Sequence, residues 1–254
     1  MKKRVTSGVV IALVTICSIL AGGILLKAVC FLIGLYGAYE LVKCVRNDFD
    51  LLTYLLTAST ILLIYFDFDR ATLYLILDAF SLFIVSIFDK KREIDDLAVM
   101  LLMTLIIGSS IYFYVYTSEI NKWILGYAFV VAFLTDLFAF FVGTRFGTHK
   151  LNERVSPNKS IEGAIGGVVL GSLASILYAL IFRFFGLQKS LVIIMSILLP
   201  IISQIGDLAY SLLKRYYGIK DFSNLIPGHG GLLDRLDSVS FTICIIGIIL
   251  KFVG

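Results

Sequence analysis

Long apolar runs recur along the whole chain and constrain its fold more than any other feature. Hydrophobic residues fill 59% of the 254 positions and charged residues only 16%, against about 25% charged residues in soluble domains. Such a chain lacks the polar residues that would cover a water-soluble core. Because about 20 apolar residues in a helix cross the hydrocarbon core of a bilayer, the sequence predicts an all-α, polytopic integral membrane protein.

Nine apolar segments have about the length of a membrane span, and the basic residues predict a cytoplasmic N-terminus. With that orientation, sixteen of the 22 Lys and Arg residues lie on the cytoplasmic side. Only Gly22 and Gly23 separate the first two segments, so these segments either form a tight hairpin or are miscounted as two spans. The predicted spans are 5–21, 24–45, 51–66, 71–88, 97–117, 123–143, 163–185, 189–212 and 238–253.

The same orientation places the two longest polar connections, 144–162 and 214–237, in the cytoplasm. Long connections in compact proteins are usually functional or disordered. We therefore divide the chain into N-terminal transmembrane helices, 1–120, and a second transmembrane region, 121–254, which carries both cytoplasmic loops and is expected to hold any functional site. The net charge of +4 is small and scattered, which argues against a nucleic-acid partner.

Charged residues and glycines are concentrated between positions 207 and 237. Asp207, Ser211 and Lys214 have the i, i+4, i+7 spacing of one helix face. Further along, the glycines around 228–231 can bring backbone N–H groups close to an anion. Charged helix ends and glycine turns often have only a structural role. Their convergence with carboxylates in an apolar protein favours a site for a divalent cation and phosphates.

The same segment resembles the signature of the phosphatidate cytidylyltransferase (CDP-diacylglycerol synthase) family. All of the positions that define that signature are filled, which makes the resemblance far more specific than a single glycine motif. The matching positions are Ser211, Lys214, Arg215, Lys220, Asp221, Pro227, Gly228, His229, Gly230, Gly231, Asp234, Arg235 and Asp237.

An upstream segment resembles a second conserved region of that family, and Glu40 also fits the pattern. The sequence departs from it at Phe140, Thr148 and Ser160, where tyrosine, lysine and threonine are common; the serine keeps the hydroxyl group. The matching positions are Asp136, Ala139, Gly143, Gly147, His149, Lys150, Leu151, Ser156, Pro157, Lys159, Glu162, Gly163, Gly166 and Gly167.

The resemblance implies that a phosphate oxygen of phosphatidic acid attacks the α-phosphorus of CTP and that pyrophosphate leaves. The nucleophile is already an anion, so positioning and electrostatics matter more than a strong base. The implied partners are CTP, phosphatidic acid and membrane lipid, and the implied cofactor is Mg²⁺. A second cation and a homodimer are left open. The implied location is a bacterial inner membrane, with the active site facing the cytoplasm.

The resemblance and the residue chemistry together assign roles. Asp207 and Asp234 are the first choice as Mg²⁺ ligands, and Asp237 is the second candidate. His229 either donates to a phosphate oxygen or caps a turn. In the other loop, Ser156, Lys159 and Glu162 either bind nucleotide or lipid head group or only surround the start of a helix at Ser160. The residues assigned to catalysis are Ser211, Lys214, Arg215, Lys220, Asp221, His229 and Arg235; those assigned to substrate binding are Asp136, Ser156, Lys159, Glu162, Gly230 and Gly231.

Two other functions fit parts of the pattern. A CTP-dependent polyprenol or phytol kinase would direct attack to the γ-phosphorus, but the filled signature through Asp237 speaks against it. An ion-coupled transporter would use the intramembrane acids Asp78, Asp136 and Asp207. The sequence shows no paired repeats of the kind that transporters usually have.

Overall fold

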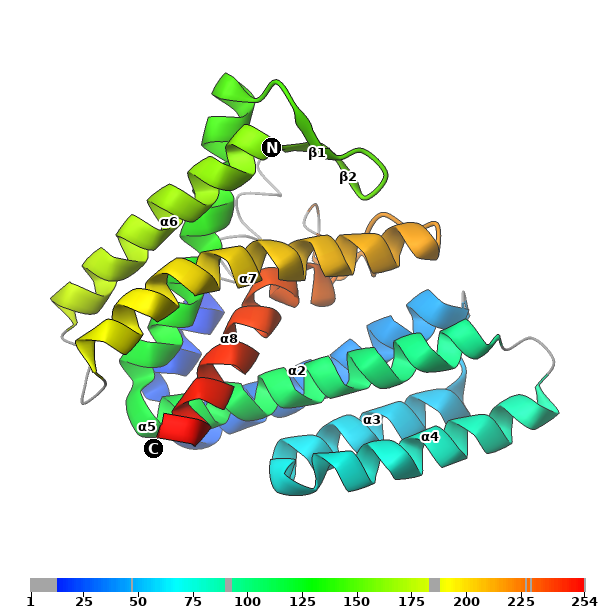
Figure 1. Cartoon of the computed structure of the whole chain (residues 1–254). Coiled ribbons are helices and arrows are strands. Elements are labelled where there is room, and N and C mark those ends of the chain that lie inside the picture. The colour runs from blue at the N-terminus through cyan, green and yellow to red at the C-terminus, as the bar shows by residue number, and fades with distance from the viewer. Residues whose placement is uncertain are drawn as a thin grey trace. The chain divides into compact units, whose positions relative to one another are not determined.

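The computed structural model describes residues 13–46, 48–89, 93–182, 188–226, 228 and 230–253 (Figure 1). Residues 13–21 are helical, and the chain then continues through further helices and a short hairpin. The elements are α2 (Gly23–Arg46), α3 (Leu51–Phe66), the 3₁₀ helix η1 (Phe68–Arg70), α4 (Ala71–Phe88), α5 (Ile94–Phe146), β1 (Lys150–Asn152), β2 (Ser156–Ser160), α6 (Ile161–Ile181), α7 (Lys189–Tyr216) and α8 (Leu233–Val253).

The helices follow the predicted spans closely. α3 and α4 coincide with the spans predicted at 51–66 and 71–88. α5 is broken at Asn121, where the backbone is extended (φ −162°, ψ 113°), between the spans predicted at 97–117 and 123–143. Within the described ranges, five helices are long and apolar enough to cross a membrane: Gly23–Arg46, Phe68–Phe88, Ile94–Phe146, Ile161–Ile181 and Lys189–Tyr216.

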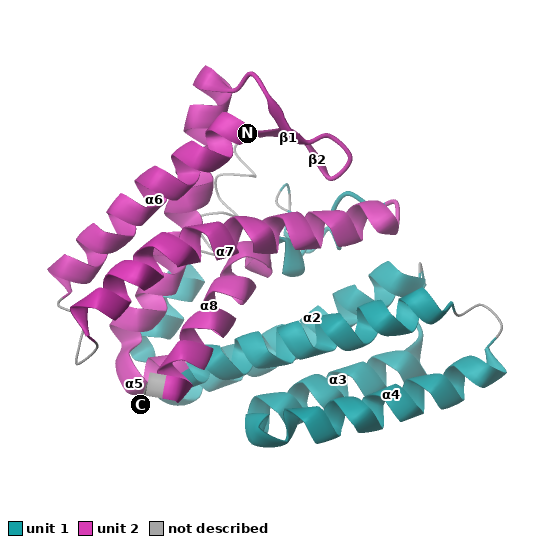
Figure 2. Cartoon of the chain, in the orientation of Figure 1, with its two compact units in different colours: residues 1–116, 219–235 teal, residues 117–218, 236–254 magenta. Residues whose placement is uncertain are grey.

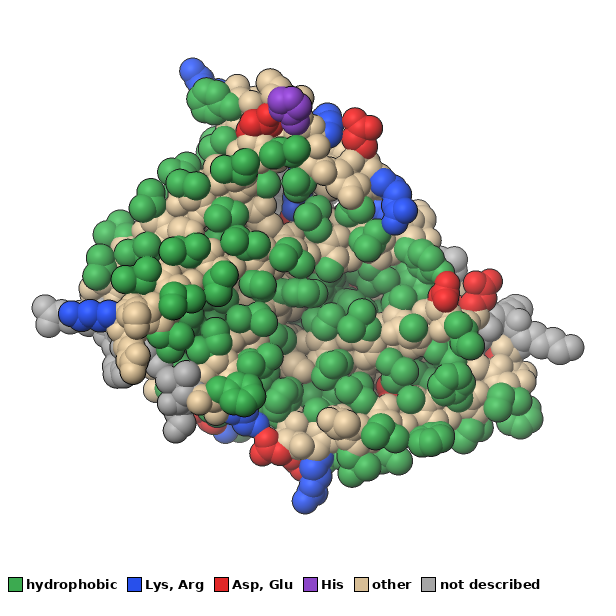
Figure 3. All heavy atoms as spheres, in the orientation of Figure 1, with side chains coloured by type: hydrophobic (Ala, Val, Ile, Leu, Met, Phe, Trp, Pro, Cys, Tyr) green, Lys and Arg blue, Asp and Glu red, His purple; other side chains and the backbone are tan. Residues whose placement is uncertain are grey.

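These helices are those of an all-α integral membrane protein. The count of nine spans and the cytoplasmic N-terminus stay predictions, because the first predicted span, 5–21, lies partly outside the described residues. Large apolar side chains are exposed on many helices, among them Phe80 and Phe88 of α4 and Leu180 of α6, and they cover much of the face shown in Figure 3. Water-soluble monomers rarely expose such apolar surface, whereas a bilayer solvates it.

The connection at 144–162, which the sequence predicts as a loop, contains a β-hairpin. β1 and β2 pair antiparallel, with Lys150 opposite Ser160 and Asn152 opposite Ser156. The hairpin leads directly into α6, whose N-cap is Ser160: the Ser160 hydroxyl accepts a hydrogen bond from Gly163 N at 3.1 Å. Such a cap satisfies a helix N–H that would otherwise have no partner. The alternative that a helix begins at Ser160 is confirmed.

The chain forms two compact units (Figure 2). The first unit contains residues 1–116 and 219–235, and the second contains residues 117–218 and 236–254. Most of the polar connection 214–237, namely residues 219–235, therefore belongs with the N-terminal helices, although it follows α7 in the sequence. The hairpin and the charged end of α7 belong to the second unit.

Glycines let the helices of the first unit approach one another closely. A Cβ added at Gly34 of α2 would lie 2.9 Å from Ile111 Cδ1 of α5, and one added at Gly108 of α5 would lie 3.0 Å from Ile64 Cβ of α3. Membrane helices commonly pack through such small residues, because close approach of backbones maximises van der Waals contact. α3 therefore packs with α2, α4 and the first part of α5.

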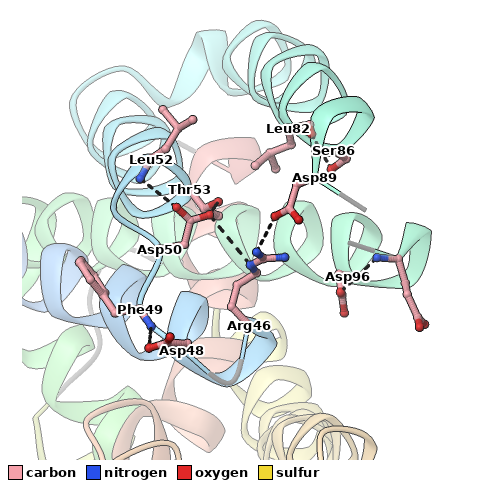
Figure 4. A network of polar contacts seen from close by, with 11 residues as sticks. Arg46, Asp48, Phe49, Asp50, Leu52, Thr53, Leu82, Ser86, Asp89 and Asp96 are labelled. Carbon is pink, nitrogen blue, oxygen red and sulfur yellow. Dashed lines mark hydrogen bonds and ion pairs between the residues drawn. The ribbon is translucent and has the colours of Figure 1, made fainter. Parts of the chain in front are cut away.

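Arg46 joins the ends of α2, α3 and α4 (Figure 4). Its Nη2 donates to Asp89 Oδ2 at 2.6 Å, just after α4, and its Nε lies 3.9 Å from Asp50 Oδ2. Asp50 is the N-cap of α3 and accepts hydrogen bonds from Leu52 N and the Thr53 hydroxyl. Only 15% of the Arg46 side chain is exposed, so water screens these ion pairs less than a surface pair.

In the second unit, a stripe of glycines on α6 packs against the second half of α5. Gly163, Gly167 and Gly171 are spaced by four residues, and a Cβ at any of them would collide with Ala139 or Thr135 of α5. α7 is tied to the same helices by two polar contacts: Gln204 Nε2 donates to Ala164 O at 2.9 Å, and the hydroxyls of Tyr127 and Ser196 lie 2.8 Å apart.

Candidate active site

Asp207 of α7 forms an ion pair with Lys159 of β2, although the two residues are 48 positions apart. Lys159 Nζ donates to Asp207 Oδ2, and the Ser211 hydroxyl lies 3.4 Å from Asp207 Oδ1. α7 is continuous through this region, so the predicted shared face of Asp207 and Ser211 is confirmed. The half-buried carboxylate of Asp207 therefore has the ammonium group of Lys159 as a partner.

Gly206 brings α8 against α7 beside this carboxylate. A Cβ added at Gly206 would lie 2.8 Å from the carbonyl oxygen of Asp237 and 3.0 Å from Phe241 Cβ. The carboxylate of Asp237 interacts electrostatically with Asp207, Lys214 and, more weakly, Asp136. Two neighbouring carboxylates repel each other, and a cation placed between them removes that repulsion.

Asp136 of α5 reaches the same neighbourhood through Ser238 of α8. The Ser238 hydroxyl donates to Asp136 Oδ2 at 3.0 Å, while the Ser238 N–H donates to Asp237 Oδ1 at 2.8 Å. Ser238 is almost fully buried, at 3% exposure. Ser238 matches no motif in the sequence, and its only signal is a hydroxyl group directly after Asp237.

Two basic residues follow one another near the end of α7. Lys214 is buried, at 8% exposure, and its positive charge favours the ionised form of the Asp237 carboxylate. Arg215 Nε donates to the carbonyl oxygen of Val155, in the turn of the hairpin, at 3.4 Å. The hairpin is thus held to α7 by Lys159 and by Arg215. Their assignment to substrate and catalysis stays a prediction.

Glu162, in the first turn of α6, binds the segment that precedes the hairpin. Its Oε1 accepts from the Thr148 hydroxyl at 2.6 Å and lies 2.6 Å from His149 Nδ1, and its Oε2 accepts from Thr148 N at 3.1 Å. Both carboxylate oxygens therefore have protein partners. Ser156 is half-buried in β2. The contacts of Glu162 and Ser156 with substrate stay predictions.

In the first unit, two carboxylates hold the glycine loop that precedes α8. Asp234 Oδ2 accepts from Phe222 N and Gly231 N, both at 2.8 Å. Glu40 of α2 accepts from the Ser223 hydroxyl at 2.6 Å, from Leu232 N at 2.8 Å and from Leu233 N at 2.7 Å. The N–H of Gly231, which the sequence predicts as a phosphate donor, is directed at Asp234.

The remaining predicted residues of this loop are placed as follows. Gly230 has φ +84°, a backbone conformation that favours glycine. Its carbonyl oxygen accepts a hydrogen bond from Ile226 N at 2.9 Å. The side chains of Lys220, Asp221 and Arg235 are exposed. Pro227 and His229 lie outside the described residues, so the two alternatives for His229 stay open.

No group of three His, Cys, Asp or Glu side chains in the described ranges is arranged to hold a metal ion by itself. Mg²⁺ does not need such a group, because it is usually bound by one or two carboxylates together with water and substrate phosphates. The neighbouring carboxylates of Asp207 and Asp237 match that donor set.

The sequence comparisons agree with the chemistry of these residues. The phosphatidate cytidylyltransferase of Staphylococcus epidermidis is 33% identical to this chain over 262 residues, covering 98% of the chain and 99% of the relative. The phosphatidate cytidylyltransferase of Staphylococcus haemolyticus is 40% identical over 178 residues, covering 69% and 68%. The model of the cytidylyltransferase family matches residues 2–253. The chain therefore belongs to the cytidylyltransferase family.

Proposed function

We propose that this chain is a phosphatidate cytidylyltransferase, which transfers the cytidylyl group of CTP to phosphatidic acid and releases pyrophosphate. The observation that carries this proposal is the family match over residues 2–253, together with relatives of that name that align over nearly their full length. The exposed apolar helices provide the membrane setting that a lipid substrate requires.

In this reaction a phosphate oxygen of phosphatidic acid forms a bond to the α-phosphorus of CTP. The bond from the α-phosphorus to the bridging oxygen of the β-phosphate breaks, and pyrophosphate carries away the electron pair. Both substrates are polyanions, so the main tasks are to bring them together and to stabilise the leaving group. We assign these tasks to Lys159, Lys214 and Arg215, with Lys220 and Arg235 as further phosphate contacts.

We further propose that Mg²⁺ is held by Asp207 and Asp237, and this proposal ranks Asp237 ahead of Asp234. It is supported by the electrostatic interaction of these two carboxylates and by the ammonium group that pairs with Asp207. Asp234 has one oxygen occupied by two backbone N–H groups and stays a predicted ligand. When bound, Mg²⁺ would neutralise charge on the triphosphate.

The proposed location is a bacterial cell membrane, with the site facing the cytoplasm. The named relatives are bacterial, and CTP is a cytoplasmic metabolite. The predicted positive-inside distribution of Lys and Arg supports the same orientation.

The direct test is an assay of the full chain, purified in detergent, with phosphatidic acid, Mg²⁺ and CTP labelled at the α-phosphate. The expected result is label in the lipid fraction as CDP-diacylglycerol, with an equal amount of pyrophosphate in solution. Label that appears only in CDP would instead indicate a lipid kinase. No consumption of CTP under any of these conditions would contradict the proposed function.

A further inference from the structure

Glu40 is a buried carboxylate in the C-terminal third of a candidate membrane span, Gly23–Arg46, and it is 0% exposed. An isolated charge in such a position is costly, so carboxylates there are found with hydrogen-bond donors. Glu40 has three donors, and all of them lie more than 180 residues further along the chain: the Ser223 hydroxyl, Leu232 N and Leu233 N.

Two of these donors belong to the start of α8. The first N–H groups of any helix have no partner within the helix, and the helix dipole makes this end favourable for a negative charge. Glu40 therefore acts as a cap for α8 that is supplied by a different helix. Its two bonds to the backbone, at 2.8 and 2.7 Å, fix the point at which α8 begins.

Gly231 leaves the space that Glu40 occupies. A Cβ added at Gly231 would collide with Glu40 Oε1, and the Glu40 Cδ would lie 2.8 Å from it. On the other side of the loop, Asp234 holds Phe222 N and Gly231 N. The two carboxylates together accept hydrogen bonds from four backbone N–H groups, those of Phe222, Gly231, Leu232 and Leu233, and so restrain the described parts of the loop.

We propose that Glu40 is a positioning residue for the segment 219–235, holding the glycine loop and the start of α8 in the geometry that turnover requires. This inference rests on the proposed function, because that segment carries Lys220 and Arg235, the predicted phosphate contacts. Glu40 itself touches neither substrate; it acts through the backbone of Leu232 and Leu233 and through Ser223.

Substitutions at position 40 can remove either some or all of the hydrogen-bond acceptors of the side chain. In Glu40→Gln, the amide oxygen still accepts from Ser223 and Leu232, but the amide nitrogen then faces another donor at Leu233. Glu40→Leu keeps a similar volume and removes all three acceptors. Leu26→Ala is the matched control, because Leu26 is a buried residue of the same helix, at 3% exposure, and lies fourteen positions from Glu40.

The experiment is hydrogen exchange, followed by mass spectrometry, on the full-length protein in detergent, with turnover measured on the same samples. We expect exchange in the peptide that contains residues 222–233 to rise at least about tenfold in Glu40→Leu and less in Glu40→Gln. kcat/KM for CTP should fall in the same order, by about 10–100-fold in Glu40→Leu. Leu26→Ala should lower the unfolding temperature and leave exchange in this peptide as in the wild type.

Wild-type exchange in residues 222–233 of a folded Glu40→Leu protein would overturn the inference. If Glu40→Leu does not fold, Ser223→Ala and Glu40→Gln provide the same comparison with one bond removed in each. The exchange readout needs no substrate, so it is independent of the proposed function. If the wild type shows no cytidylyl transfer but the exchange order holds, the proposed function fails and the positioning role of Glu40 remains.

Discussion

Gly206 of α7 lies against the backbone of Asp237 in α8, so closely that a Cβ on residue 206 would be 2.8 Å from the Asp237 carbonyl oxygen. This contact brings Asp237 beside Asp207, the residue that follows Gly206. The backbones of α7 and α8 approach each other next to both aspartates because position 206 has no side chain. The first prediction concerns that glycine.

Replacing Gly206 with alanine should separate α7 from α8. Overpacking of a tightly packed contact costs about 1–3 kcal/mol, so the unfolding temperature in detergent should fall. Turnover per folded molecule should fall as well, because Asp207 and Asp237 move apart. Ile205→Ala is the neighbouring control, since Ile205 is 48% exposed on the apolar surface. Unchanged stability and turnover in Gly206→Ala would show that α8 can shift without consequence.

The second prediction tests the proposed Mg²⁺ ligands. Asp207→Asn and Asp237→Asn remove one charge with little change in volume, and each should lower kcat by about 10²-fold or more. Binding of Mn²⁺ to the substrate-free protein, measured by electron paramagnetic resonance, should weaken in both. Asp48→Asn is the control, because Asp48 is exposed and its carboxylate accepts a hydrogen bond from the N–H of the next residue, Phe49. Normal Mn²⁺ binding in both variants would remove these residues from the metal site.

The third prediction concerns the ammonium group that pairs with Asp207. If Lys159 and Mg²⁺ use the same carboxylate, Lys159→Met should bind Mn²⁺ at least about threefold more tightly, since a competing cation is gone. Turnover should nevertheless fall, because the variant lacks a proposed phosphate contact. Lys150→Met is the matched hairpin control: its Nζ donates to Pro157 O and not to a carboxylate. Weaker Mn²⁺ binding in Lys159→Met would contradict the competition.

The fourth prediction addresses the orientation in the membrane. In a variant without the native cysteines, single cysteines at Asn158 and Asn224 should react with an impermeant thiol reagent only from the cytoplasmic side. A cysteine at Asn121, where α5 is broken, should react only from the opposite side. Reaction of positions 158 and 224 from different sides would exclude a cytoplasmic location for both polar segments.

Several features of the fold and site could be read from the sequence because their causes are local. The spans at 51–66 and 71–88 coincide with α3 and α4, since a helix satisfies its own backbone and a bilayer requires that satisfaction. The helix spacing placed Asp207 and Ser211 on one face, and a serine before an apolar run marked the start of α6. The glycine at position 230 matched a backbone with positive φ.

The tertiary structure alone decided which distant residues meet. The sequence contains no local pattern that joins Lys159 to Asp207, Ser238 to Asp136 or Glu40 to the start of α8. It also did not predict the β-hairpin, whose strands β1 and β2 have only three and five residues and carry no clear alternation of apolar and polar residues. Small residues permit two of the close approaches: Gly206 lets α8 lie against α7, and Gly231 leaves room for the carboxylate of Glu40. Apolar periodicity determines that a helix crosses the membrane, but the shapes of the packed surfaces determine which polar groups it brings together.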